Sequence, residues 1–135
     1  MRILVDTNVL ISAIVFGGVP RNLLLNLLQN GQQLFVSSYI DQEFHDKIKE
    51  KWQDKYQAIY SLYRQMGFIF VESTTQKLGY LRDKKDIPIL SDALFYQIDI
   101  ILSGDKDFLE ADLDKPIILS PAMMNEFIQS KGVEF

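Results

Sequence analysis

The sequence predicts an α/β fold: a three-layer α/β/α sandwich around a mainly parallel, five-stranded sheet. Short apolar runs alternate with segments of helical periodicity five times along the chain. The first of these runs is continuously apolar, which is typical of a strand buried on both faces of a parallel sheet. There are no internal repeats and no low-complexity linkers. We therefore expect one domain over residues 1–135.

The first third of the chain predicts two strands separated by helix. Residues 2–5 form the first apolar run, and the spacing of Val9, Leu10 and Ala13 predicts a helix directly after it. Residues 17–20 interrupt that helix. Leucines at 23, 24, 27 and 28 then give a second helix one apolar face, which Asn30-Gly31 ends. Residues 34–36 predict the second strand.

The remainder repeats the alternation three more times. An apolar residue at every fourth position from Ile40 to Trp52 predicts a helix starting near residue 39, and residues 56–66 continue with helical spacing. Apolar runs at 68–71, 98–102 and 116–119 predict the last three strands. Between them we expect a polar, irregular stretch over 72–85, a helix carrying Ile89 to Leu94, a turn at 103–105 and a final helix that starts at Ser120-Pro121.

Composition limits the chemistry that this chain can perform. It has 135 residues, no cysteine, one histidine (His45) and a net charge of −4. Thiolate sites and histidine-rich metal sites are excluded, so a bound metal must be held by oxygen, which favours Mg²⁺ or Mn²⁺. No apolar run is long enough to cross a bilayer, and the N-terminus lacks the pattern of a signal peptide. We therefore expect a cytoplasmic protein that does not associate with membranes.

Four acidic residues follow, or closely follow, four different strands. Asp6 ends the first strand, Glu43 lies early in the helix after the second, Asp86 opens the helix after the third, and Asp105 follows the fourth. In a parallel sheet, strand carboxyl ends and helix amino ends share one edge. We therefore expect these four carboxylates to converge at that edge.

Converging carboxylates predict a metal-dependent hydrolase. Like charges in a partly buried cleft repel unless a cation offsets them, and a divalent ion among carboxylates can support phosphodiester hydrolysis. Thr7 and Asn8 could orient the neighbouring carboxylates. Each acid also has a purely structural explanation: Asp6 and Asp86 as helix N-caps, Glu43 as a solvated helix residue and Asp105 as a turn residue.

Three stretches resemble the PIN-domain family, and in particular its bacterial and archaeal branch of VapC-like toxin components of toxin–antitoxin systems. They are "ILVDTNVLISAI" at the N-terminus, "VSSYIDQEF" around Glu43 and "DIPILSDALFYQIDIILSGDKDF" from 86 to 108. The resemblance implies a PIN fold and a Mg²⁺- or Mn²⁺-dependent endoribonuclease. It also implies an RNA substrate, a cognate antitoxin protein as partner and a homodimer.

Residue by residue, the resemblance selects the same four carboxylates as catalytic and metal-binding residues. The polar residues that support them in the family match Thr7, Asn8 and Ser103. The chain departs from the family pattern at Lys85, where another acid is frequent, and at Gln97, where glycine is usual. Further acids that could contribute to the site stand at positions 83, 92 and 107.

Two alternatives remain open from the sequence. One is a receiver-like, Mg²⁺-binding signalling domain, although "VDTN" lacks the adjacent pair of acids that such domains place after the first strand. The other is a PIN scaffold that binds RNA or protein without cleaving it, which Lys85 in place of an acid leaves open.

Overall fold

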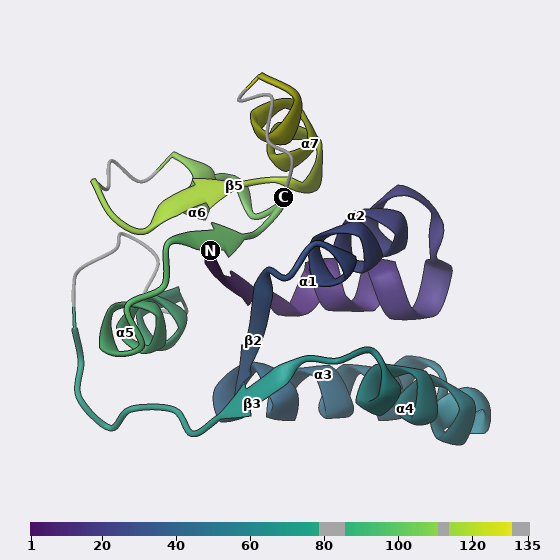
Figure 1. Cartoon of the computed structure of the whole chain (residues 1–135). Helices are drawn as coiled ribbons and strands as arrows, with labels where there is room; N and C mark the ends of the chain where they lie inside the picture. The colour runs from purple at the N-terminus through teal and green to yellow at the C-terminus, as the bar shows by residue number, and fades with distance from the viewer. Residues whose placement is uncertain (79–85, 111–113, 131–135) are drawn as a thin grey trace.

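The computed structural model describes residues 1–78, 86–110 and 114–130 of the chain (Figure 1). Five strands form one sheet in the order β3-β2-β1-β4-β5, and every neighbouring pair is parallel. The predicted five-stranded parallel sheet is therefore confirmed. The strands are β1 (Arg2–Val5), β2 (Gln33–Ser37), β3 (Ile69–Val71), β4 (Ile100–Leu102) and β5 (Ile117–Leu119).

Helical segments connect the strands mostly where the sequence predicts them. They are α1 (Thr7–Ile11), the π-helical η1 (Ser12–Phe16), α2 (Gly18–Gln29), α3 (Ser38–Lys51), the 3₁₀ turn η2 (Gln53–Lys55), α4 (Tyr56–Gln65), α5 (Ile87–Phe95), α6 (Lys106–Leu109) and α7 (Pro121–Ser130). The short α6 follows β4 where only a turn was predicted. Figure 1 shows α5 on one side of the sheet and α1, α2 and α7 on the other. Helices on both faces make the three layers expected for an α/β/α sandwich.

The central strands are buried on both faces. β1 is buried from Ile3 to Val5, and β4 is buried over its whole length. Their register places Ile3 beside both Leu34 of β2 and Ile100 of β4. Burial on both faces explains why these strands are continuously apolar in sequence.

The backbone geometry of the helix after Asp6 departs from the sequence-based expectation. The helix after Asp6 changes from α to π geometry at Ser12. Arg21 of α2 donates from Nε to the carbonyl oxygen of Ala13 (2.8 Å) and from Nη2 to that of Ile14 (2.9 Å). These bonds stabilise main-chain oxygens in the π-helical turn, where the regular hydrogen-bond ladder is displaced.

The fourth strand begins at Ile100, two residues later than predicted. Gln97 has a φ of 54°, and the Ile98 amide donates to the carbonyl oxygen of Ala93 (2.8 Å), which closes the end of α5. Gln97 therefore occupies a left-handed backbone conformation that glycine adopts at lower cost, which explains why glycine suits this position.

Within the described residues, no single helix is both long and apolar enough to cross a membrane. The pair Thr7–Phe16 and Gly18–Gln29 meets the length and composition criteria only when the two are taken together, and they are bent by 103° at their junction.

Candidate active site

The predicted site lies at the carboxyl edge of the sheet, where the central strands end in polar residues. The Asp6 amide donates to the carbonyl oxygen of Leu102 (2.9 Å), and the Ser103 amide donates to that of Leu119 (3.0 Å). The parallel pairing thus continues one residue beyond β1 and β4. It fixes Asp6 and Ser103 next to each other although they are 97 positions apart in sequence.

Asp6 is a buried carboxylate, with 6% of its surface exposed. Its Oδ1 accepts a hydrogen bond from the Thr7 amide (2.8 Å), and its Oδ2 accepts one from the Ser103 hydroxyl (2.8 Å). Burial raises the pKa of Asp6 above its ordinary value of 3.8; the two hydrogen bonds oppose this rise, and the charges of Glu43 and Asp105 add to it. Asp6 therefore caps α1, as the structural explanation predicted, and also faces two other acids.

Glu43 joins this group through Thr7. It lies in the second turn of α3, and its Oε1 accepts a hydrogen bond from the Thr7 hydroxyl (2.9 Å). Thr7 is itself buried directly after Asp6. The bond fixes the Glu43 carboxylate beside the end of β1, as expected for an orienting residue.

Ser103 links Asp6 to Asp105. The fully buried Ser103 hydroxyl donates to Asp6 and accepts from the amide of Asp105 (3.1 Å). The Asp105 Oδ1 also lies 3.5 Å from the amide of Phe108, at the start of α6. Thr7 and Ser103 therefore contact the predicted carboxylates directly or through the adjacent main chain.

Asp86 precedes α5 and is 7% exposed. It stands at the N-cap position, but its side chain makes no capping hydrogen bond to the helix. Its charge, together with the charges of Glu43 and Asp6, raises the pKa of Tyr39 after the larger effect of burial. The charges of three of the four predicted carboxylates therefore act on the pKa of the Tyr39 phenol.

Asn8 differs from the other two predicted supporting residues. It is exposed, and its Oδ1 accepts a hydrogen bond from Lys47 Nζ (3.2 Å). Tyr39, Glu43 and Lys47 follow one another at four-residue intervals along α3. Neither Tyr39 nor Lys47 was among the predicted site residues, although the i, i+4 spacing from Glu43 is the signal that could have found them.

The additional acids divide into different cases. Asp92 is 1% exposed, and both of its carboxylate oxygens accept hydrogen bonds from the segment after β3. Asp83 and Lys85 lie outside the described residues, and so does the side chain of Asp107. His45 is turned toward α4 and the first turn of α3, with Nδ1 2.8 Å from the Tyr56 hydroxyl and Nε2 3.3 Å from Asp41 Oδ1.

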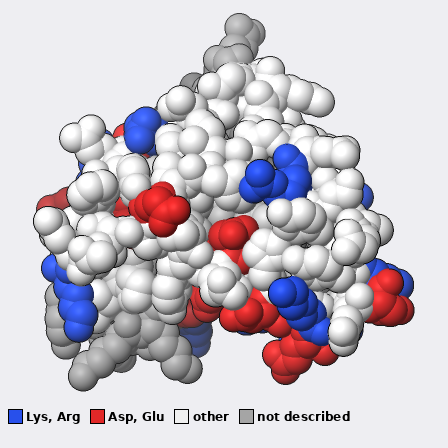
Figure 2. All heavy atoms as spheres, turned by 90° about the horizontal axis from the view of Figure 1, so that it is seen from below, with Lys and Arg blue, Asp and Glu red and all other residues white. Residues whose placement is uncertain are grey.

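The donors at this edge are carboxylate oxygens, which fit a hard divalent cation. The Asp6 carboxylate, in addition, is buried near the like charges of Glu43 and Asp105. In the described part of the chain, no three Asp, Glu or His side chains already converge as a set that could hold a metal ion. The carboxylates are therefore neighbours at one edge rather than a preformed cage. Figure 2 shows acidic side chains across the middle of one face of the molecule, with Lys and Arg side chains on both sides of them.

A comparison with protein families decides the classification. Residues 2–107 match the PIN domain model. This chain belongs to the PIN domain family. The family match supports the nuclease prediction in general terms and removes the receiver-like alternative.

Solved structures agree with this PIN fold. One chain of VapBC2 from Rickettsia felis, described as bound to a DNA fragment from its promoter, superposes with a TM-score of 0.70 at 15% sequence identity. The superposition covers 89% of this chain and 98% of that chain. No curated protein matches the sequence.

Proposed function

We propose that this PIN domain is a Mg²⁺- or Mn²⁺-dependent endoribonuclease and the toxin component of a toxin–antitoxin pair. The observation that carries the proposal is the linkage of acids at the carboxyl edge of the sheet: Thr7 holds Glu43, and Ser103 holds Asp6 and the main chain of Asp105. The structural likeness to a chain of a VapBC complex supports an antitoxin partner.

Asp6, Glu43, Asp86 and Asp105 would hold the metal. A divalent ion, when bound, supplies activation of water and stabilisation of negative charge on the phosphodiester oxygens. The chain itself contributes orientation, because Thr7 and Ser103 fix Glu43 and Asp6 by hydrogen bonds under 3 Å. One carboxylate of the group would accept the proton of the attacking water.

RNA would approach along the exposed side of α3. Lys47 lies one helical turn beyond Glu43, and its Nζ donates a hydrogen bond to Asn8, two residues after Asp6. Such a cation can contact a substrate phosphate without contacting the metal. We also propose that the protein is a homodimer and lies in the cytoplasm; both remain predictions from the sequence.

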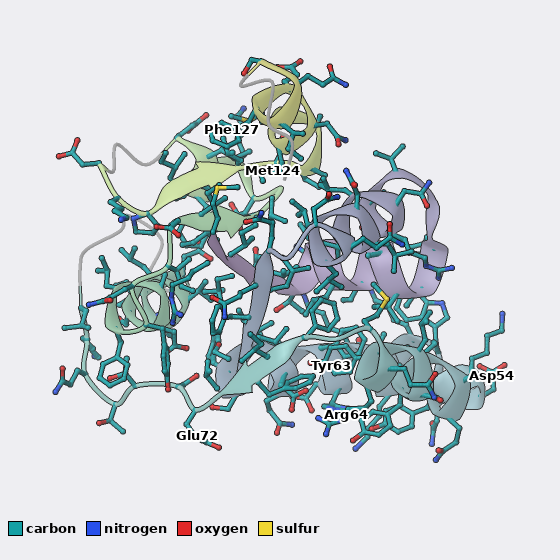
Figure 3. All side chains as sticks on the ribbon, viewed as in Figure 1. Asp54, Tyr63, Arg64, Glu72, Met124 and Phe127 are labelled. Carbon is teal, nitrogen blue, oxygen red and sulfur yellow. The ribbon has the colours of Figure 1, made fainter. Side chains whose placement is uncertain are left out.

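The direct test is cleavage of structured and unstructured RNA by the purified protein, with Mn²⁺ and with EDTA. Asp6→Asn should abolish cleavage, because it removes one metal-binding carboxylate. Asp54→Asn is the matched control; Asp54 is exposed and lies at the far end of α3 and α4 in Figure 3. Equal cleavage by the Asp6→Asn variant and the parent would refute the assignment. RNA binding without cleavage by the parent would favour the non-cleaving scaffold instead.

A further inference from the structure

The segment that follows β3 is bound to two acid-bearing helices at once. Glu72, labelled in Figure 3, stands where β3 ends, and Ser73 and Thr74 come next. On one side, this segment contacts the start of α3, the helix that carries Glu43. On the other side, it contacts Asp92 of α5, the helix that Asp86 precedes.

The contact with α3 is reciprocal. The Ser73 amide donates to the Ser38 hydroxyl (2.8 Å), and the Ser73 hydroxyl accepts from the amide of Tyr39 (2.9 Å). Ser38 and Tyr39 form the first turn of α3, whose amides lack partners within the helix. Ser73 therefore fixes the amino end of this helix one turn before Glu43.

The contact with α5 ends on a buried carboxylate. The same Ser73 hydroxyl donates to Asp92 Oδ2 (2.7 Å), and the Thr74 amide donates to Asp92 Oδ1 (2.7 Å). Asp92 is 1% exposed, and the amide of Tyr96 at the end of α5 donates to its main-chain oxygen. A carboxylate this deeply buried is costly unless both oxygens are satisfied, and here both are.

The geometry points to Asp92 as a positioning residue: with Ser73 it joins the amino end of α3 to α5 and thereby sets the separation of Glu43 from Asp86. The inference rests on the proposed function, because it concerns two of the carboxylates proposed to hold the metal. It also accounts for an acid that would otherwise count as a spare ligand. Asp92 acts through other groups and does not itself hold the ion.

Ser91 provides a matched control on the same helix and the same segment. Its hydroxyl accepts from the amide of Leu78 (2.9 Å) and donates to the carbonyl oxygen of Leu78 (3.0 Å). Ser91→Ala therefore loosens the segment from α5 without removing a bond to α3. Ser73→Ala removes the hydroxyl that joins Tyr39 to Asp92, and it leaves the amide bond to Ser38 and the bond between Thr74 and Asp92 in place.

The first experiment measures the Mn²⁺ concentration that gives half-maximal RNA cleavage, beside calorimetric Mn²⁺ binding without RNA. Asp92→Ala and Ser73→Ala should raise that concentration about tenfold, the lower end of the loss seen when groups that position metal ligands are removed. The cleavage rate at saturating Mn²⁺ should recover. Asp92→Asn, whose oxygen can still accept from the Thr74 amide and whose NH2 group can donate to the Ser73 hydroxyl, should stay near the parent, and so should Ser91→Ala.

The second experiment measures geometry directly, and the absence of native cysteine makes it possible. Spin labels on Gln42→Cys in α3 and Leu94→Cys in α5, both exposed positions, report the separation of the two helices. We expect the distance distribution to broaden in Ser73→Ala and Asp92→Ala and to stay unchanged in Ser91→Ala. All variants are compared below their melting transitions.

The outcomes separate the inference from the proposed function. A parent that neither binds Mn²⁺ nor cleaves RNA overturns the proposed function and, with it, the role of Asp92. An active parent whose Ser73→Ala and Asp92→Ala variants keep the parental Mn²⁺ dependence, or whose label distances are unchanged, overturns the inference alone. Equal effects of Ser91→Ala and Ser73→Ala would show a general loosening and would also overturn it.

Discussion

Asp6→Asn should separate the stability of the fold from its affinity for metal. Burial raises the pKa of Asp6, so between its ordinary value of 3.8 and the higher value in the fold, the folded protein binds more protons than the unfolded chain. Stability therefore falls as pH rises through this range and stays lower at neutral pH. Asparagine resembles the protonated form. In EDTA at pH 7 the variant should melt at or above the parental temperature, and near pH 3 this difference should disappear.

The effect of metal has the opposite sign and a calculable size. At a Mn²⁺ concentration of about 100 times Kd, binding to the folded state stabilises the parent by about 2.7 kcal/mol. For 135 residues, an unfolding entropy of about 2.1 cal/mol/K per residue converts this into a rise in Tm of about 10 °C. Asp6→Asn should lose most of that rise.

Thermal melts followed by circular dichroism, with EDTA and with Mn²⁺, measure both effects on the same samples. Asp54→Asn again serves as the control and should show the full shift with Mn²⁺. A parental Mn²⁺ shift in the Asp6→Asn variant would refute Asp6 as a ligand. A markedly lower Tm in EDTA would show that the hydrogen bonds from Thr7 and Ser103 outweigh the cost of burying the charge.

Three further predictions concern other parts of the molecule. Lys47→Gln should raise the KM for RNA about threefold or more at low salt and leave kcat unchanged. It should also lower the slope of log K for RNA binding against log salt concentration by about one, whereas Lys49→Gln should change neither the KM nor this slope. Arg21→Ala should cost about 2 kcal/mol in denaturant unfolding, because two carbonyl oxygens at η1 lose a charged donor; an unchanged midpoint would mean that water replaces the guanidinium. Gln97→Gly should change stability by no more than about 1 kcal/mol and in the favourable direction, since it relieves a φ of 54°; a clear loss would show that the side chain compensates for the strain.

The fold was predictable because its local signals agree with one another. Continuous apolar runs mark β1 and β4, which are buried on both faces, and helical periodicity marks α2 to α5. Predictions were least accurate where tertiary contacts decide the backbone. The π-helical η1 depends on Arg21 of the following helix, and the start of β4 depends on how α5 ends at Gln97.

The candidate site was predictable as a set of acids but not as a network. The position of Asp6 after a buried strand indicated the edge of the sheet, and parallel topology brought Ser103 beside it. The partner of Asn8 could not be read from a single segment, because Lys47 reaches it from another helix. The hydrogen-bond partners of Asp92 were harder still to predict, since they lie in an irregular polar stretch that shows no periodicity.

The structure also weighs the capping explanation against the metal explanation for the acids. Asparagine and aspartate cap helices about equally well, so a cap alone does not require a charge at Asp6. The charge is costly there, because burial and two neighbouring acids all raise its pKa. Asp86 stands at an N-cap position but makes no capping bond, so capping does not account for it. A buried carboxylate with like-charged neighbours is expected of a residue that binds a metal cation, since the bound cation would offset the repulsion among these carboxylates and be attracted by all of them.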